Sequence, residues 1–137
     1  MSSAQIALRK ALFSALNADD QLKEELGEGR IFDTAPRGQS FPFLRFDEVD
    51  SHPLAAFLGE GEEHAITLSV LSRTPSRDQA VIAAYRVASV LEEAPLTLSG
   101  HLLVDLRVTE VMTSRLRDGR TFQAEVHLRA VTEPAAA

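Results

Sequence analysis

The chain lacks cysteine and tryptophan, has a single tyrosine, and contains only short apolar runs. Without cysteine it can form neither disulfides nor thiolate metal sites. A membrane-spanning helix needs about 20 consecutive apolar residues, and no run approaches that length. The opening stretch MSSAQIALRKALFSAL carries Arg9 and Lys10 inside its apolar pattern, so it is a poor signal peptide. These absences predict a soluble protein that functions in the cytoplasm without a membrane.

Positive charge is also scarce, because 14 Lys and Arg face 20 Asp and Glu, for a net charge of −6. The sequence shows no basic stripe of the kind with which nucleic-acid-binding proteins hold phosphates. DNA is therefore expected to pass this protein rather than to be held by it. The 137 residues fit one domain, predicted over 1–133, followed by a flexible tail over 134–137.

Three segments place apolar residues at helical spacing. The first covers 3–17, and a short one runs from Asp19 or Asp20 to Leu26, where a glycine follows. The third, over 75–93, begins at a Thr-Pro step that suits a helix start. Its predicted apolar face consists of Val81, Ala84, Tyr85, Ala88 and Leu91.

Alternating apolar and polar residues predict strands over 43–49 and 63–72 and a hairpin around the Asp-Gly turn at 118–119. If that turn pairs Val111 with the apolar Val126, the same register places Val108 opposite an arginine. One extra residue at 109–110 restores apolar pairing, so we predict a β-bulge there, with a longer turn as the alternative. The inward residues of the last strand are predicted to be Phe122, Ala124, Val126, Leu128 and Ala130.

The element order is thus α-β-β-α-β-β, with the short second helix as an addition. This order predicts an α+β fold: a single four-stranded, mainly antiparallel sheet with two main helices packed on one face. Four of the seven phenylalanines lie within GRIFDTAPRGQSFPFLRF, residues 29–46, and are expected to seat the first strand on the helices. They are Phe32, Phe41, Phe43 and Phe46.

No sequence motif predicts catalysis, a cofactor or a metal site. The histidines His52, His64, His101 and His127 lack the i, i+4 spacing of a helical metal pair and are expected to be solvated. No G-x-S-x-G motif is present, and LGEGEE lacks both the Walker lysine and the third glycine of a dinucleotide loop. The chain is therefore predicted not to be an enzyme.

The segment 47–63 is predicted to be a long loop with carboxylates near both ends. A catalytic carboxyl pair needs an apolar pocket, whereas these groups are expected to form a solvated acidic rim. They are Asp47, Glu48, Asp50, Glu60, Glu62 and Glu63. Between them lies PLAAFL, whose Leu54, Phe57 and Leu58 either fold back on the core or form an arm that docks on a neighbouring subunit.

Four segments, GRIFDTAPRGQSFPFLRF, EHAITLSVLSR, APLTLSGHLLVDLRV and RTFQAEVHLRAVTEP, together carry a resemblance. In this order they resemble the phage tail completion proteins, the head–tail joining or tail terminator proteins of long-tailed phages and gene transfer agents. The resemblance covers about residues 5–134. Leu71 departs from it, since an aromatic residue usually precedes the Ser-Arg step in that family.

The resemblance implies an α+β virion protein without catalytic activity. It implies self-association into a ring, commonly a homohexamer, at the head-proximal end of the tail. Its partners would be the tail tube protein and a neck or head–tail connector protein, with assembly in the host cytoplasm. Six copies of −6 would carry −36. The carboxylates of 47–63, or Glu110, would then line the lumen or rim and let DNA slide through without specific binding.

A second function remains open from the residues alone. The chain could be a small cytoplasmic module that holds a peptide or ligand in an apolar cleft between helices and sheet. A ring protein predicts a closed oligomer, whereas a module predicts a monomer.

Overall fold

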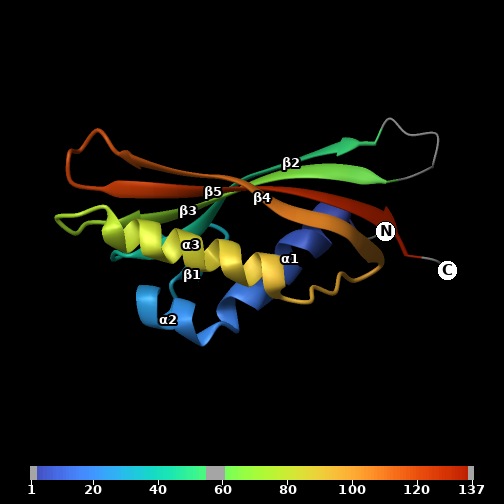
Figure 1. Cartoon of the computed structure of the whole chain (residues 1–137), viewed down its shortest axis with the longest axis horizontal. Coiled ribbons are helices and arrows are strands. Elements are labelled where there is room, and N and C mark those ends of the chain that lie inside the picture. The colour runs from blue at the N-terminus through green and yellow to red at the C-terminus, as the bar shows by residue number, and fades with distance from the viewer. Residues whose placement is uncertain (1–2, 55–60, 136–137) are drawn as a thin grey trace.

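The computed structural model describes residues 3–54 and 61–135. In these residues three helices pack on one face of a five-stranded sheet (Figure 1). The helices are α1 (Ala4–Asn17), α2 (Asp20–Leu26) and α3 (Asp78–Glu93). The strands are β1 (Ile31–Phe32), β2 (Phe43–Pro53), β3 (Glu62–Ser72), β4 (His101–Arg115) and β5 (Phe122–Pro134). The α+β class is thereby confirmed.

The sheet has the order β1-β2-β3-β5-β4, and the four-stranded prediction is wrong by one strand. The additional strand β1 pairs parallel with β2 through two residues, Ile31 opposite Leu44 and Phe32 opposite Arg45. All other neighbouring strands are antiparallel. A two-residue strand is too short to show alternation in a sequence, which is why the pattern of residues 29–46 did not reveal it.

Side chains cap the starts of the first two helices. The Ser3 hydroxyl accepts a hydrogen bond from the Ile6 amide, and an Asp19 carboxylate oxygen accepts one from the Leu22 amide at 2.8 Å. Arg86 of α3 donates two hydrogen bonds to Asp19, at 2.6 and 2.8 Å. The hydrogen bonds from Arg86 hold the pKa of Asp19 below its usual value. This pair joins the start of α2 to the middle of α3.

Helix α3 buries most of the predicted face, since Ala84, Ala88 and Leu91 are buried and Val81 is half-buried. Tyr85 is 57% exposed, so its predicted burial is wrong. The face that meets the sheet is built largely from alanine, which lets the helix lie close to the strands, and a tyrosine ring would not fit there. The buried residues are Ala80, Ala83, Ala84, Val87, Ala88, Val90 and Leu91.

The β4–β5 hairpin confirms the predicted register and its bulge. Val111 faces Val126, Val108 faces Leu128, and the register shifts between Val108 and Glu110. A second shift, between Leu103 and Asp105, was not predicted. The inward residues predicted for the last strand are all buried, with at most 5% of each exposed.

Strands β2 and β3 are longer than predicted, and the prediction of a loop over 47–63 is therefore wrong. β2 continues to Pro53 and β3 begins at Glu62, so most of the expected loop is paired strand. The Leu54 amide still donates to the Gly61 carbonyl at 2.9 Å. A bulge between Phe46 and Glu48 interrupts the alternation in β2, which hid the strand in the sequence.

The core lies between the helices and the sheet. Leu8, Leu12 and Leu16 of α1 are fully buried against it. Phe46 belongs to this core, as expected. Phe43 points to the opposite face of the sheet, where its ring contacts those of Phe32 and Phe41, with centroids 6.1 and 5.2 Å away. The phenylalanines thus hold the first strand from both sides.

Candidate assembly surfaces

The face of the sheet that points away from the helices, here called the outer sheet face, is largely polar, with apolar side chains such as Phe43, Leu71 and Met112 among the polar ones. Strand register places alternate residues of β2, β3, β5 and β4 on it. Those with charged or hydrogen-bonding side chains include Arg45, Asp47, Glu48, Asp50, Glu63, Thr67, Ser69, Asp105, Arg107, Glu110, Gln123, Glu125, His127 and Arg129.

Hydrogen bonds cross this face from strand to strand. Arg45 pairs with Asp47 at 2.8 Å, and the Ser69 hydroxyl donates to the same carboxylate. Gln123 donates to Ser69 and to Glu125, each at 3.0 Å. A hollow of about 340 Å³ lies within this network. Its lining is Arg45, Asp47, Glu48, Thr67, Glu125 and His127.

The predicted carboxylates mostly share this face, although as strand residues rather than loop residues. Asp47 and Glu63 are ion-paired, with Arg45 and Arg129 respectively. Glu48, Asp50 and Glu110 are exposed, and within residues 3–54 and 61–135 no cation pairs with them.

Two predicted rim residues lie elsewhere. The register gives Glu62 the helix-facing side of β3, where its carboxylate is 3.9 Å from the Nε2 atom of His64. Glu60 lies outside the described residues. Asp105 and Glu125 also lie on the outer sheet face, although neither was among the predicted rim carboxylates.

Of the predicted docking arm, Leu54, Phe57 and Leu58, only Leu54 is among the described residues. Leu54 is half-buried and packs beside Gly61, where an added Cβ atom would come within 2.9 Å of the Leu54 Cδ1 atom. Phe57 and Leu58 lie outside the described residues. Their role as subunit contacts stays a prediction.

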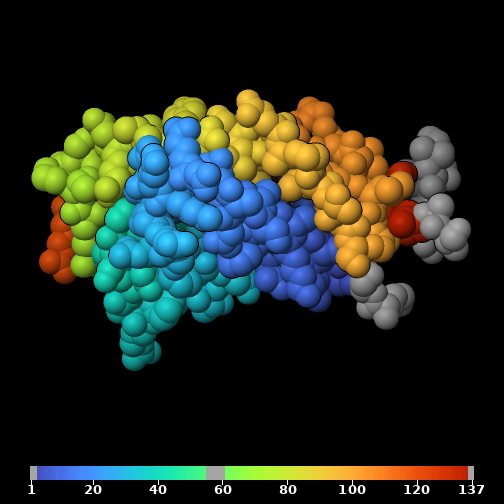
Figure 2. Space-filling view, turned by 90° about the horizontal axis from the view of Figure 1, so that it is seen from below, coloured from blue at the N-terminus to red at the C-terminus, as the bar shows by residue number. Residues whose placement is uncertain are grey.

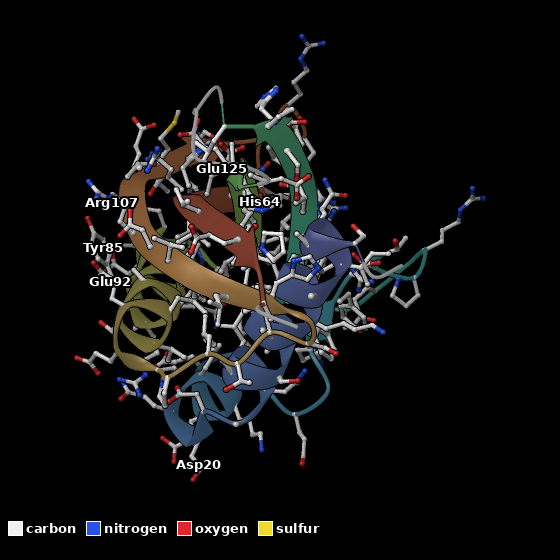
Figure 3. The ribbon with its side chains drawn as sticks, turned by 90° about the vertical axis from the view of Figure 1, so that its right-hand side faces the viewer. Asp20, His64, Tyr85, Glu92, Arg107 and Glu125 are labelled. Atoms are coloured by element: carbon white, nitrogen blue, oxygen red, sulfur yellow. The ribbon has the colours of Figure 1, made fainter. Side chains whose placement is uncertain are left out.

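His64 is fully buried, and its predicted solvation is wrong (Figure 3). It has the same parity as Ile66, Leu68 and Val70, a signal that could have placed it inside. Gln5 of α1 donates to the Ser51 hydroxyl at 2.9 Å, and that hydroxyl shares a hydrogen bond with the Nδ1 atom of His64 at 2.7 Å.

The other ring nitrogen of His64, Nε2, shares a hydrogen bond with the Thr132 hydroxyl at 2.9 Å. The Glu62 carboxylate, 3.9 Å from Nε2, is too far away to hydrogen-bond the imidazole as the carboxylate of a hydrolase triad does. Desolvation lowers the pKa of His64, opposed by Glu62 and assisted by His101. The cluster joins α1, β2, β3 and β5 in one contact.

Apolar side chains gather along one flank of the molecule, here called the α3–β4 flank. Figure 3 shows Tyr85 of α3 and Arg107 of β4 on the same side. In Figure 2 α3 and β4 run along one long side, and the segment that leads into β2 runs along the other. The large apolar residues exposed on these two elements, by 45–57%, are Ile82 and Tyr85 on α3 and Leu102, Val104 and Met112 on β4. The register places Leu102 and Met112 on the outer sheet face.

The same flank carries an unpaired strand edge. β4 is the last strand of the sheet, so beyond His101, which forms a bridge with Leu98, one side of the strand has no strand neighbour within the described chain. At the other side of the sheet, β1 pairs with β2 only at Leu44 and Arg45. The rest of that edge, residues 46–53, is covered in part by Gln5, which donates to the Val49 carbonyl at 3.1 Å. Long exposed edges of this kind invite pairing with another chain.

Comparison with known proteins identifies the family. The family model described as "Tail completion protein gp17" matches residues 10–133. The chain belongs to this family of tail completion proteins.

Two solved structures share the fold over nearly the whole chain. A chain in the virion of a native gene transfer agent particle is 26% identical, with a TM-score of 0.86 that covers 96% of this chain and 99% of that one. The gp17 protein of bacteriophage SPP1 is 21% identical, with a TM-score of 0.64 that covers 93% of this chain and 89% of that one. The second likeness supports the fold alone. No curated protein matches.

Family membership makes this tail completion protein a structural component of a virion tail. The space between helices and sheet is filled largely by buried leucines and alanines. Two surface hollows, of about 420 and 460 Å³, lie on either side of α1, one against the segment 95–99 and one against β1. No helix among the described residues is both long and apolar enough to cross a bilayer. Within residues 3–54 and 61–135, no group of three His, Asp or Glu side chains is placed to hold a metal ion.

Proposed function

We propose that this tail completion protein closes into a ring, a homohexamer, at the head-proximal end of the tail and joins the tail tube to the neck. The observation that carries the proposal is the α3–β4 flank. Five of the six large apolar residues exposed in the described chain lie on α3 or on β4, the edge strand of the sheet. A monomer gains nothing from such a surface, whereas a neighbouring subunit would bury it.

The contact would be heterologous, because the two incompletely paired edges lie on opposite sides of one sheet. One copy would offer its α3–β4 flank and the next its β2 side. Contacts of this kind close into a ring when the rotation fits. Two β2 edges would repel each other, since Asp47, Glu48 and Asp50 are exposed within four residues.

Side-by-side packing also determines which face of the sheet lies on the outside of the ring and which lines the lumen. The helices cover one face, which would lie outside, and the outer sheet face would line the lumen. Its unpaired carboxylates Glu48, Asp50 and Glu110 would repel DNA from the wall. The ring would act by shape and charge, without catalysis or a cofactor.

Engineered cysteines test the proposal, because the natural chain has none. Asp50→Cys on β2 and Val104→Cys on β4 both replace exposed residues on opposite sides. Assembled tails that carry both changes, treated with a flexible bis-maleimide, are expected to yield a ladder of covalent multimers that ends at the ring number. Each single variant is the control and cannot extend beyond a dimer.

Two results would count against the ring. Tails that contain the double variant but release only monomers after cross-linking would contradict side-by-side contacts. A strong dimer from Val104→Cys alone would instead indicate a two-fold pair of β4 edges. Native mass spectrometry of the tail-end complex gives the copy number independently of the linker.

A further inference from the structure

One end of the molecule concentrates positive charge, although the whole chain is acidic. The turn between β4 and β5 and the connection between β3 and α3 lie together at one end of the long axis (Figure 1). The free ends of β2 and β3, at Pro53 and Glu62, point to the other. The arginines of the first end, here called the basic end, are Arg73, Arg77, Arg115, Arg117 and Arg120.

Contacts with shared partners bring these arginines together. The guanidinium carbon atoms of Arg77 and Arg115 lie 5.3 and 5.4 Å from the centroid of the Phe122 ring. Arg73 donates to Asp118 within the β4–β5 turn at 3.4 Å. Segments 40 residues apart in the sequence thus supply one cluster, which explains why no basic stripe was visible along the chain.

The carboxylates at this end do not neutralise it. Asp118 accepts hydrogen bonds from the Arg120 amide and from the amide and hydroxyl of Thr121. These bonds lower the pKa of Asp118 to about 2, so it stays charged and holds the turn. Asp78 is the other carboxylate in these segments. Five arginines and two aspartates leave +3 here and therefore −9 on the rest of a chain whose net charge is −6.

Four of the guanidinium groups are left for a partner. Arg77, Arg115, Arg117 and Arg120 are exposed, and no described carboxylate pairs with them. The cluster contains no lysine. Arginine presents a planar fork of donors that matches an oxygen pair, and the Phe122 ring holds two of the forks in place.

We infer that the basic end is the surface through which the ring docks on a carboxylate-rich protein surface of the adjoining ring of the virion. This inference rests on the proposed function. If flanks join side by side, the two ends of the long axis face the two rims of the ring. The basic end then meets the next protein ring rather than the lumen.

A protein carboxylate fits this place better than a DNA phosphate. DNA must slide through the ring, and each guanidinium that neutralised a phosphate would raise the affinity for DNA and hinder its movement. At a rim between two rings the same groups give orientation, because the rest of the subunit carries −9 and the same acidic partner would repel it. Charge thus selects which rim faces the adjoining ring.

Charge reversal tests the docking surface. Tails from particles that lack the chain are incubated with purified Arg117→Glu/Arg120→Glu protein and with tail-free heads, and joined particles are counted by electron microscopy. The change repeats in every copy of the ring, so joining is expected to fall about tenfold or more. Lys10→Glu/Lys23→Glu shifts the net charge equally but changes helices α1 and α2, and it should leave joining intact.

Conservative variants identify the partner group. Arg117→Lys/Arg120→Lys keeps the charge and supplies amines that a carbodiimide couples to carboxylates in contact with them. In assembled particles, mass spectrometry is expected to find an amide bond to an Asp or Glu of a different protein. Linkage only to copies of this chain, or no linkage in joined particles, would overturn the inference.

Two further outcomes separate the alternatives. Normal joining by the charge-reversal variant would end the docking inference while the ring proposal stands. The charge-reversal variant can also carry the Asp50→Cys and Val104→Cys changes. If it then fails to yield the ladder of cross-linked multimers, the arginines take part in ring closure instead. Arginine-dependent binding of a duplex DNA probe, measured by fluorescence anisotropy at about 0.15 M salt, would indicate a nucleic-acid contact and contradict a protein partner.

Discussion

At the scale of single residues, the polar groups that matter most are buried. His64 is enclosed between Ser51 and Thr132, and Gln5 reaches the same cluster from α1. Burial favours the neutral imidazole, because desolvation disfavours the charged form and lowers the pKa of His64. Protonation would place a positive charge in this enclosed position, where the hydrogen-bond partners of the ring are neutral hydroxyls. The cluster therefore stabilises the fold only while His64 stays neutral.

The stability of the protein should consequently fall in mild acid. The pKa of His64 is lowered in the folded state, so the unfolded chain takes up its proton first as the pH drops below about 6.5. Urea unfolding from pH 8 to pH 5 is expected to show this decline. His64→Gln should lower the unfolding free energy by about 1–3 kcal/mol at pH 8, because partners are left unpaired, and should flatten the decline.

His52→Gln is the control for this measurement. His52 lies on the same hairpin but is exposed, so its replacement should change neither the stability at pH 8 nor the acid decline. An unchanged pH dependence in the His64 variant would show that another group causes the decline.

At the scale of elements, some features follow from the sequence and others do not. The bulge at 109–110 was predictable because apolar residues on both strands had to meet across a turn of known length. The exposure of Tyr85 on α3 was not predictable, since alanines lie on several sides of this helix and do not define which side is buried. Only the short distance between α3 and the sheet excludes the tyrosine ring from the buried face. The sequence indicated which carboxylates to consider, but it placed them in a loop. Because β2 continues to Pro53, Glu48 and Asp50 are strand residues on the outer sheet face.

The α3–β4 flank allows a matched comparison between two isoleucines. Ile82 on the flank is 51% exposed, and Ile6 on α1 is 47% exposed. Either residue replaced by lysine should alter the unfolding free energy by no more than about 0.5 kcal/mol, because both side chains already meet water. Only Ile82→Lys is expected to reduce the yield of tail-end rings, measured by native mass spectrometry. Equal yields from the two variants would remove the flank from the interface.

At the scale of the whole molecule, charge is sorted by location. The basic end carries +3, while the outer sheet face holds the unpaired Glu48, Asp50 and Glu110. A net charge alone could not show this separation, since it depends on which distant segments the fold brings together. In the proposed ring these two surfaces have different tasks, because one contacts a protein and the other faces moving DNA.

The lumen assignment predicts a change in DNA passage without a change in assembly. Glu48→Lys/Asp50→Lys/Glu110→Lys removes the formal charge of the chain, from −6 to 0, on the outer sheet face. Particles should still join, but DNA release should slow as the wall attracts phosphates, and added salt should restore the rate. Release is measured from purified particles by fluorescence of a DNA dye at about 0.05 and 0.3 M salt.

Glu24→Lys/Glu28→Lys/Glu92→Lys makes the same charge change at exposed positions on or beside the helices and should release DNA at the normal rate. Equal slowing in both variants would mean that net charge, and not the outer sheet face, governs passage.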